Sequence, residues 1–215
     1  MAALIQSITI AALPVVLAIT LHEAAHGYVA RHFGDPTAWQ AGRVSLNPLR
    51  HIDPFGTVLL PLILFVMNSP VLFGWAKPVP VNFSRLRHPK RDMLWVAAAG
   101  PTVNLLMALA WAGLYKLSLL IPANVYSLPL EKMSGIGISI NLALMVLNLL
   151  PLPPLDGGRI AVSLLPHPLA LKFARLERWG FLILLVLLYF HVLDYIMWPF
   201  VALFTNLIVI LFQLN

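Results

Sequence analysis

The chain has 215 residues, the size of a single domain, of which 60% are hydrophobic and only 10% are charged. Together with a mean hydropathy of +0.87, this composition excludes a soluble globular protein and predicts a protein with several membrane spans. The sequence contains no cysteine, which excludes disulfides and cysteine-ligated metals. Its net charge of +6 lacks the basic amphipathic stripe that would favour a nucleic-acid partner.

The apolar stretches predict an all-α polytopic membrane protein with about five to six transmembrane helices. We expect full spans over residues 3–31, 92–121, 134–150, 180–192 and 195–214. A short re-entrant or extended region should follow the first helix, because residues 36–56 are rich in glycine and proline and residues 57–73 are short for a span. We further expect a loop at 74–91, a short helix at 159–166 and a basic loop at 167–179.

Nearly all of the 14 lysines and arginines fall within three loops, at residues 31–50, 77–91 and 159–178. Cytoplasmic loops of membrane proteins carry an excess of such residues. All three loops share the cytoplasmic side only if residues 57–73 dip into the membrane and return under cover of protein atoms. We therefore expect a re-entrant segment, an outside N-terminus and an inside C-terminus, although a short tilted span also fits.

The first apolar segment contains the motif His22-Glu23-Ala24-Ala25-His26. Residues four positions apart lie one turn apart on the same face of a helix, so both imidazoles can bind one zinc ion. Glu23 can then act as the general base on the attacking water. Ionisable side chains are expected in a membrane span only when they are paired, bind metal or face a water-filled cavity. The motif therefore predicts a zinc-dependent hydrolase site at membrane depth.

Catalytic zinc sites usually have three protein ligands and one open position, so a third ligand is needed. Among the eight acidic residues, Asp156 is the strongest candidate, because it follows a proline-broken apolar helix and precedes two glycines. Its rivals are Asp194, which lies where a turn is expected, and His32, which a straight helix carries about 9 Å along its axis from His26. We expect Asp156 to complete the site unless it pairs with Arg159.

Two motifs together carry a resemblance to a known family. They are His22-Glu23-x-x-His26-Gly27 and Asn148-Leu149-Leu150-Pro151-Leu152-Pro153-Pro154-Leu155-Asp156-Gly157-Gly158-Arg159. This pair resembles the site-2 protease family of intramembrane zinc metalloproteases. The elements Asn47-Pro48, Gly74–Val81 and Gly100-Pro101-x-x-Asn104 are similar to its compact prokaryotic branch, which has no PDZ domain. The resemblance covers about residues 20–160.

The resemblance implies that His22, His26 and Asp156 bind Zn2+, one ion per chain, and that Glu23 is the catalytic acid/base. Asn148 matches a family asparagine proposed to hold the substrate or the oxyanion. These assignments also agree with the chemistry, because a side-chain amide can stabilise an oxyanion beside the metal.

The resemblance further implies one integral-membrane metalloprotease domain over residues 1–215, with a catalytic core at about 3–160 and C-terminal helices at about 161–215. Asn104 is expected to help pack the core helices. We expect a multi-pass protein of a prokaryotic cell membrane, in contact with the bilayer, that cuts membrane proteins within or near a transmembrane helix. No nucleic-acid partner is expected.

Other functions could use the same residues. A membrane zinc hydrolase of lipid-like or prenylated substrates would need a cavity open to lipid, whereas a non-enzymatic metal transporter would repeat ionisable residues across several spans. An inactive scaffold is a further reading, against which the intact Glu23 argues. For the peptidase, the substrate helix must unwind before attack, and unpaired edges within residues 40–56 could take it up as an added strand.

Overall fold

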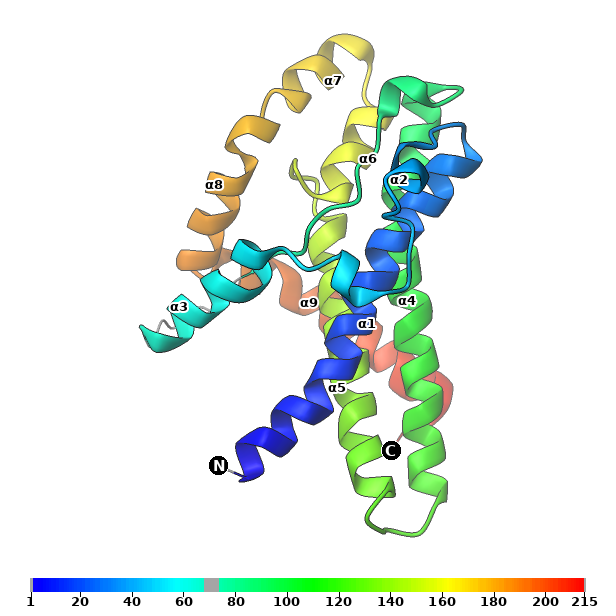
Figure 1. The fold of residues 1–215 in the computed structure, drawn as a ribbon, viewed down its shortest axis with the longest axis vertical. Coiled ribbons are helices and arrows are strands. Elements are labelled where there is room, and N and C mark those ends of the chain that lie inside the picture. Colours follow the sequence, from blue (N-terminus) through cyan, green and yellow to red (C-terminus); the bar gives the residue numbers. More distant parts are fainter. Residues whose placement is uncertain (1, 68–73, 215) are drawn as a thin grey trace.

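The computed structural model describes residues 2–67 and 74–214, and these residues form helices and irregular segments without a strand (Figure 1). The helices are α1 (Ala2–His32), α2 (Thr37–Gln40), α3 (Leu60–Val66), α4 (Pro89–Leu120), α5 (Ser127–Leu149), α6 (Asp156–Leu164), α7 (His167–Ala174), α8 (Glu177–Tyr189) and α9 (Val192–Phe212). A π-helical turn at Pro54–Leu59 leads into α3. The expected all-α class is confirmed, but the region at 40–56 offers turns and short helical pieces instead of a strand edge.

Four helices in the described residues are long and apolar enough to cross a membrane: α1 from Thr9 onward, α4, α5 and α9. This confirms a polytopic membrane protein. The span expected at 180–192 corresponds to α8, whose 13 residues measure only about 20 Å at 1.5 Å per residue. That is short of a hydrocarbon core of about 30 Å. The expected segment 180–192 was itself no longer than α8, so a full crossing was not possible. The chain turns directly after α8, at His191, which adopts a left-handed φ of 56°.

The structural centre is an antiparallel hairpin of α4 and α5 that packs against α1 (Figure 1). The two helices of the hairpin approach closely at Gly137, where a Cβ atom would come within 2.4 Å of the Trp111 ring. Leu142 is fully buried in the same cluster, Ile208 brings α9 against it, and Leu17 of α1 packs on its edge. Burial of these apolar side chains fixes the three long helices that carry the candidate site.

Gly56 and Thr57, at the start of the expected re-entrant segment, lie beside Trp75, which follows it. Trp75 donates its backbone N–H to the carbonyl oxygen of Gly56 over 3.1 Å, and Thr57 Oγ1 donates to the carbonyl oxygen of Trp75 over 2.8 Å. Residues 68–73 lie outside the described part of the chain. A full crossing would separate the two ends of the segment by about 30 Å, so these hydrogen bonds support the re-entrant interpretation.

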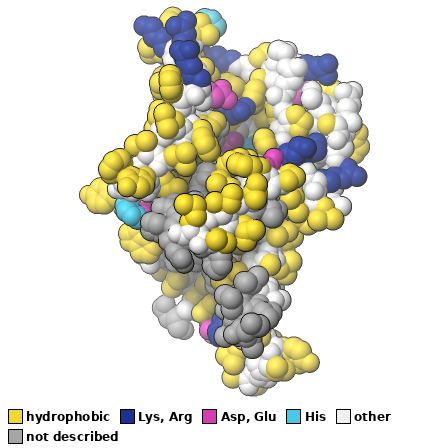
Figure 2. Space-filling model, turned by 60° about the vertical axis from the view of Figure 1, so that its left-hand side comes forward, with side chains coloured by type: hydrophobic (Ala, Val, Ile, Leu, Met, Phe, Trp, Pro, Cys, Tyr) yellow, Lys and Arg dark blue, Asp and Glu magenta, His cyan; other side chains and the backbone are white. Residues whose placement is uncertain are grey.

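The three basic loops lie at one end of the bundle, where α1 ends, α4 begins and α6 joins α7 (Figure 1). Most Lys and Arg side chains visible in Figure 2 gather in the corresponding upper half of the molecule. Residues 167–179, expected as a loop, instead contain α7. The expected position of the C-terminus was wrong: Lys116 Nζ donates to the carbonyl oxygen of Gln213 over 2.6 Å, beside the last turns of α4. The chain ends away from the basic loops because α8 is too short to cross.

Candidate active site

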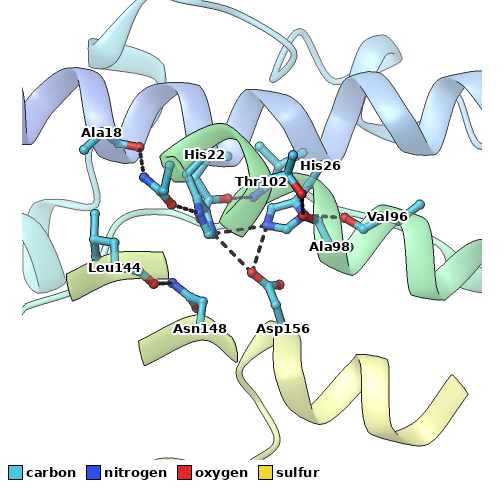
Figure 3. Close-up of polar contacts among 12 residues, drawn as sticks. Ala18, His22, His26, Val96, Ala98, Thr102, Leu144, Asn148 and Asp156 are labelled. Atoms are coloured by element: carbon cyan, nitrogen blue, oxygen red, sulfur yellow. Dashed lines mark hydrogen bonds and ion pairs between the residues drawn. The ribbon is translucent and has the colours of Figure 1, made fainter. Parts of the chain in front are cut away.

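Three of the predicted site residues converge between α1 and the first turn of α6 (Figure 3). Asp156 Oδ2 lies 3.3 Å from His22 Nε2 and 3.4 Å from His26 Nε2. The two Nε2 atoms lie 3.2 Å apart. The three side chains are only 10–12% exposed. The structure therefore brings together, from two segments far apart in sequence, the set of residues that the motifs single out.

Helix α1 places the two imidazoles on one face because His22 and His26 are four residues apart. This face needs space, and Gly100 of α4 provides it. A Cβ atom at Gly100 would lie 2.5 Å from His22 Cε1 and 2.6 Å from His26 Nε2. The backbone of α4 thus forms the wall against which both rings rest, and any larger residue at position 100 would push them out of place.

The position of Asp156 depends on a tight turn between α5 and α6. Helix α5 ends at Leu149, as expected before Pro151, since the residue preceding a proline avoids the helical region. The first turn of α6 then folds back onto this turn. A Cβ atom at Gly157 would lie 2.3 Å from the carbonyl oxygen of Leu149, and one at Gly158 would lie 2.3 Å from the nitrogen of Pro153. Only glycine allows this approach, which directs the carboxylate toward α1.

The donor set fits a zinc ion. In a tetrahedral site with bonds of about 2.0–2.1 Å, any two ligand atoms are separated by about 3.3–3.4 Å. The observed separations of 3.2, 3.3 and 3.4 Å match this spacing. Asp156 Oδ2 is buried without a hydrogen-bond partner, which is unusual for a carboxylate oxygen unless another ligand satisfies it. Two imidazole nitrogens and one carboxylate oxygen are a ligand set typical of catalytic zinc.

Each imidazole is held from behind through its Nδ1 atom. His26 Nδ1 lies 2.7 Å from the carbonyl oxygen of Val96, and His22 Nδ1 lies 2.6 Å from Asn104 Oδ1. Because a carbonyl oxygen only accepts, His26 Nδ1 is the donor, and Nε2 carries the free lone pair in the neutral ring. No feature of the sequence predicts the Val96 contact, since every residue has a carbonyl group. For Asn104 the sequence predicted only a role in helix packing, and the structure adds the contact with His22.

Glu23 lies beside the three convergent residues but is not one of them. Its Oε2 atom accepts the backbone N–H of Val79 over 2.8 Å. Val79 belongs to the irregular segment 77–81, which we call the cover segment. The Val79 side chain also packs against α1, where a Cβ atom at Gly27 would lie 3.2 Å from Val79 Cγ1. Pro78 and Pro80 have no N–H group, so Val79 supplies the donor in the middle of this proline-rich stretch. The arrangement fixes the Glu23 carboxylate at the edge of the site.

A cavity of about 340 Å³ connects these groups. It is lined by His22, Glu23, His26, the cover segment, Asn148, Asp156 and Arg159, among others. Asn148 Nδ2 donates to the carbonyl oxygen of Leu144 in its own helix over 3.0 Å (Figure 3). An amide nitrogen carries two N–H donors, and this bond uses one of them. Asn148 therefore borders the cavity without belonging to the three convergent residues.

The rivals considered for the third ligand lie elsewhere. Asp194 pairs with His191 over 2.9 Å on the exposed surface, and the His32 ring stacks edge-on against Phe33 at the end of α1. Arg159 does not pair with Asp156; its Nη2 atom lies 3.4 Å from Glu177 Oε1. Among the described residues, one group of three or more metal-binding side chains is close enough to share an ion, and it contains Asp156.

Comparison with known proteins places these residues in context. Residues 117–188 match the model of "Peptidase family M50". A protein of Bacillus subtilis (strain 168), named "Putative zinc metalloprotease YwhC", is 40% identical over 189 residues, which cover 86% of this chain and 82% of that protein. Two mycobacterial proteins named "Putative zinc metalloprotease Rip2" are each 31% identical. The match with the Mycolicibacterium smegmatis protein covers 80% of this chain and 63% of that protein. The match with the Mycobacterium tuberculosis (strain H37Rv) protein covers 70% of this chain and 54% of that protein. No solved structure matches the chain significantly.

Proposed function

The chain belongs to peptidase family M50, the site-2 protease family of zinc metalloproteases, and from this premise we propose that it is an intramembrane endopeptidase. It hydrolyses peptide bonds in or near transmembrane segments of other membrane proteins. One observation carries this proposal: His22, His26 and Asp156 converge beside α1, a helix apolar enough to span a membrane. Reactive side chains at such a depth favour a substrate that also lies in the bilayer.

His22, His26 and Asp156 are the proposed ligands of one zinc ion per chain. When bound, zinc acts as a Lewis acid and lowers the pKa of a coordinated water to about 7. The three side chains hold their ligand atoms on one side, because α4 packs behind the imidazoles and the turn before α6 directs the carboxylate. The cavity beside them is bordered by α4, the cover segment and the turn before α6, and this is where a substrate can approach.

Glu23 is the proposed general acid/base. Its carboxylate lies in the cavity next to the ligand residues and accepts the Val79 N–H. It takes a proton from the attacking water and later returns it to the nitrogen of the departing peptide fragment. The hydrogen bond from Val79 to Oε2 orients the carboxylate, which keeps lone pairs on both oxygens for this transfer.

Asn148 is a proposed donor to the oxyanion. Its bond to Leu144 leaves the second N–H of the amide for the substrate. A substrate helix must unwind locally before its carbonyl group can reach this donor, since its backbone groups are otherwise hydrogen-bonded within the helix. We further propose that the protein resides in the cytoplasmic membrane of a prokaryotic cell, with a membrane protein as the substrate.

Cleavage of a model transmembrane substrate by the purified protein tests this function. We expect His22→Ala, His26→Ala and Asp156→Ala to lower zinc content, while Glu23→Gln keeps zinc and loses activity. Glu23→Gln is nearly isosteric and preserves the contact with Val79 through its amide oxygen, so a loss of activity is not a packing effect. Hydrolysis of a prenylated or lipid-like substrate, with intact transmembrane peptides, would instead support the alternative hydrolase.

A further inference from the structure

A chain of buried hydrogen bonds links α5 to His22 through two asparagines. Asn104 and Asn141 are both completely buried. Asn141 Nδ2 donates to the carbonyl oxygen of Gly137 over 2.8 Å, and Asn104 Nδ2 donates to Asn141 Oδ1 over 2.9 Å. Asn104 Oδ1 in turn lies 2.6 Å from His22 Nδ1. The chain crosses from α5 through α4 to α1, the three helices at the centre of the fold.

The direction of every bond in this chain follows from its two backbone ends. The carbonyl of Gly137 only accepts, so Asn141 turns its NH2 group toward it and presents Oδ1 to Asn104. Asn104 must therefore donate from its own NH2 group to Asn141 Oδ1. A second backbone acceptor, the carbonyl oxygen of Ala18, supports the same orientation at the longer distance of 3.3 Å. Asn104 then has only Oδ1 left for His22.

Because Asn104 presents an acceptor, His22 must carry its proton on Nδ1. In a neutral imidazole the lone pair is then on Nε2, the atom that lies near Asp156 and His26. If the Asn104 amide turned over, its NH2 group would face His22 and favour a proton on Nε2, which blocks ligation. In a buried apolar core no water is available to correct a wrong orientation.

We propose that Asn141 and Asn104 are positioning residues that hold His22 in its metal-binding tautomer. We call this pair of asparagines the relay. This inference rests on the proposed role of His22 as a zinc ligand. His26 needs no such relay, because its Nδ1 meets the Val96 carbonyl directly. The effect of Asn141 on zinc affinity therefore runs through Asn104 and His22, and Asn141 acts on the site without contacting any ligand atom.

Zinc affinity of the full-length purified protein, measured by competition with a chromogenic chelator, tests the relay. Loss of the partner of a metal-bound histidine typically lowers metal affinity about 10–100-fold, and we expect a loss in this range for Asn104→Leu. Asn141→Leu removes one of two anchors of the Asn104 amide, so its loss should approach about 10-fold. Ser134→Ala is the matched control, since Ser134 is buried on the same helix and its Oγ has no hydrogen-bond partner.

A double variant separates orientation from packing. In Asn104→Asp, a carboxylate replaces the amide and both of its oxygens accept, so it holds the Nδ1 proton of His22 in either orientation, while the Asn141 amide turns over to donate to the carboxylate. We expect Asn104→Asp to keep zinc affinity and Asn141→Leu to cause no further loss in that background. A loss of equal size in both backgrounds would mean that Asn141 acts through packing and would overturn the relay.

Failure of the relay and failure of the proposed site give different results. If His22→Ala loses zinc while Asn141→Leu binds zinc like the wild type, the relay is overturned and the site stands. If His22→Ala retains zinc, the ligand assignment and the relay fall together. Thermal unfolding of the zinc-free variants identifies any that are misfolded, and the Asn104→Asp background then gives the decisive comparison.

Discussion

Val79 donates its backbone N–H to Glu23 Oε2 over 2.8 Å, although the two residues are 56 positions apart in the chain. The proposed base is therefore held by the main chain of the cover segment and not by a neighbouring side chain. A fixed carboxylate keeps one oxygen oriented toward the cavity, whereas a free glutamate would sample several rotamers.

Removing this donor should slow catalysis. Val79→Pro lacks the N–H, and a hydrogen bond to a charged group contributes about 1.5–3 kcal/mol, so we expect turnover to fall about 10–100-fold with zinc content unchanged. Val79→Ala keeps the N–H and is the control for the lost side chain. Equal turnover of the two variants would show that the contact does not orient Glu23.

The wall formed by Gly100 should be essential for metal binding. In Gly100→Ala, the new Cβ atom would lie 2.5–2.6 Å from both rings, and overpacking of this kind typically costs about 1–3 kcal/mol. We expect zinc affinity to fall by at least about 10-fold, as measured by chelator competition. Gly113→Ala lies on the same helix, where the nearest atom is 3.8 Å away, and should bind zinc normally. Normal affinity in Gly100→Ala would contradict the tight contact.

Asn148 should affect rate and not metal content. Removing one oxyanion donor typically lowers kcat about 10²–10³-fold, and we expect Asn148→Ala to fall near the lower end while retaining zinc and thermal stability. Asn148→Asp should be no faster, since a carboxylate adds negative charge where the oxyanion forms. Wild-type turnover in Asn148→Ala would show that this side chain has no catalytic role and only makes the helix contact with Leu144.

Membrane topology can be mapped with single cysteines, because the native chain has none. Cysteines at Arg50, Arg87 and Arg175 should all react with an impermeant reagent from the cytoplasmic side, since the basic loops share one end of the bundle. A cysteine at Gln213 should react from the opposite side, given its contact with Lys116. Labelling of Arg50 and Arg87 from opposite sides would mean that residues 57–73 span the membrane.

Local patterns in the sequence anticipated much of the fold and of the site's composition. The spacing of His22 and His26 defines one helix face, and the prolines and glycines around Asp156 predict a broken helix that folds back. Charge distribution favoured the re-entrant segment, which the contacts of Trp75 support. Each of these features depends on residues close together in the chain or on a simple asymmetry between loops.

Features that depend on contacts between distant segments could not be predicted. The carbonyl of Val96 and the N–H of Val79 are backbone groups, which carry no residue-specific signal. The role of Asn104 became visible only when α4 packed against α1. A turn near Asp194 was expected, but the prediction counted residues 180–192 as a full span, although a helix of that length is too short to cross the hydrocarbon core. The C-terminus was therefore predicted on the wrong side.

The closeness of Gly100 to both imidazoles also constrains how a substrate is admitted. Helices α1 and α4 cannot slide past each other without moving two metal ligands, and the asparagine chain holds α5 to the same pair. One side of the cavity is thus immobile as long as the metal site is intact. The wall that carries none of the three convergent residues is the cover segment, so a polypeptide can enter with the metal site intact only past this segment. The cover segment is therefore the movable wall of the cavity, and α1, α4 and α5 are its fixed walls.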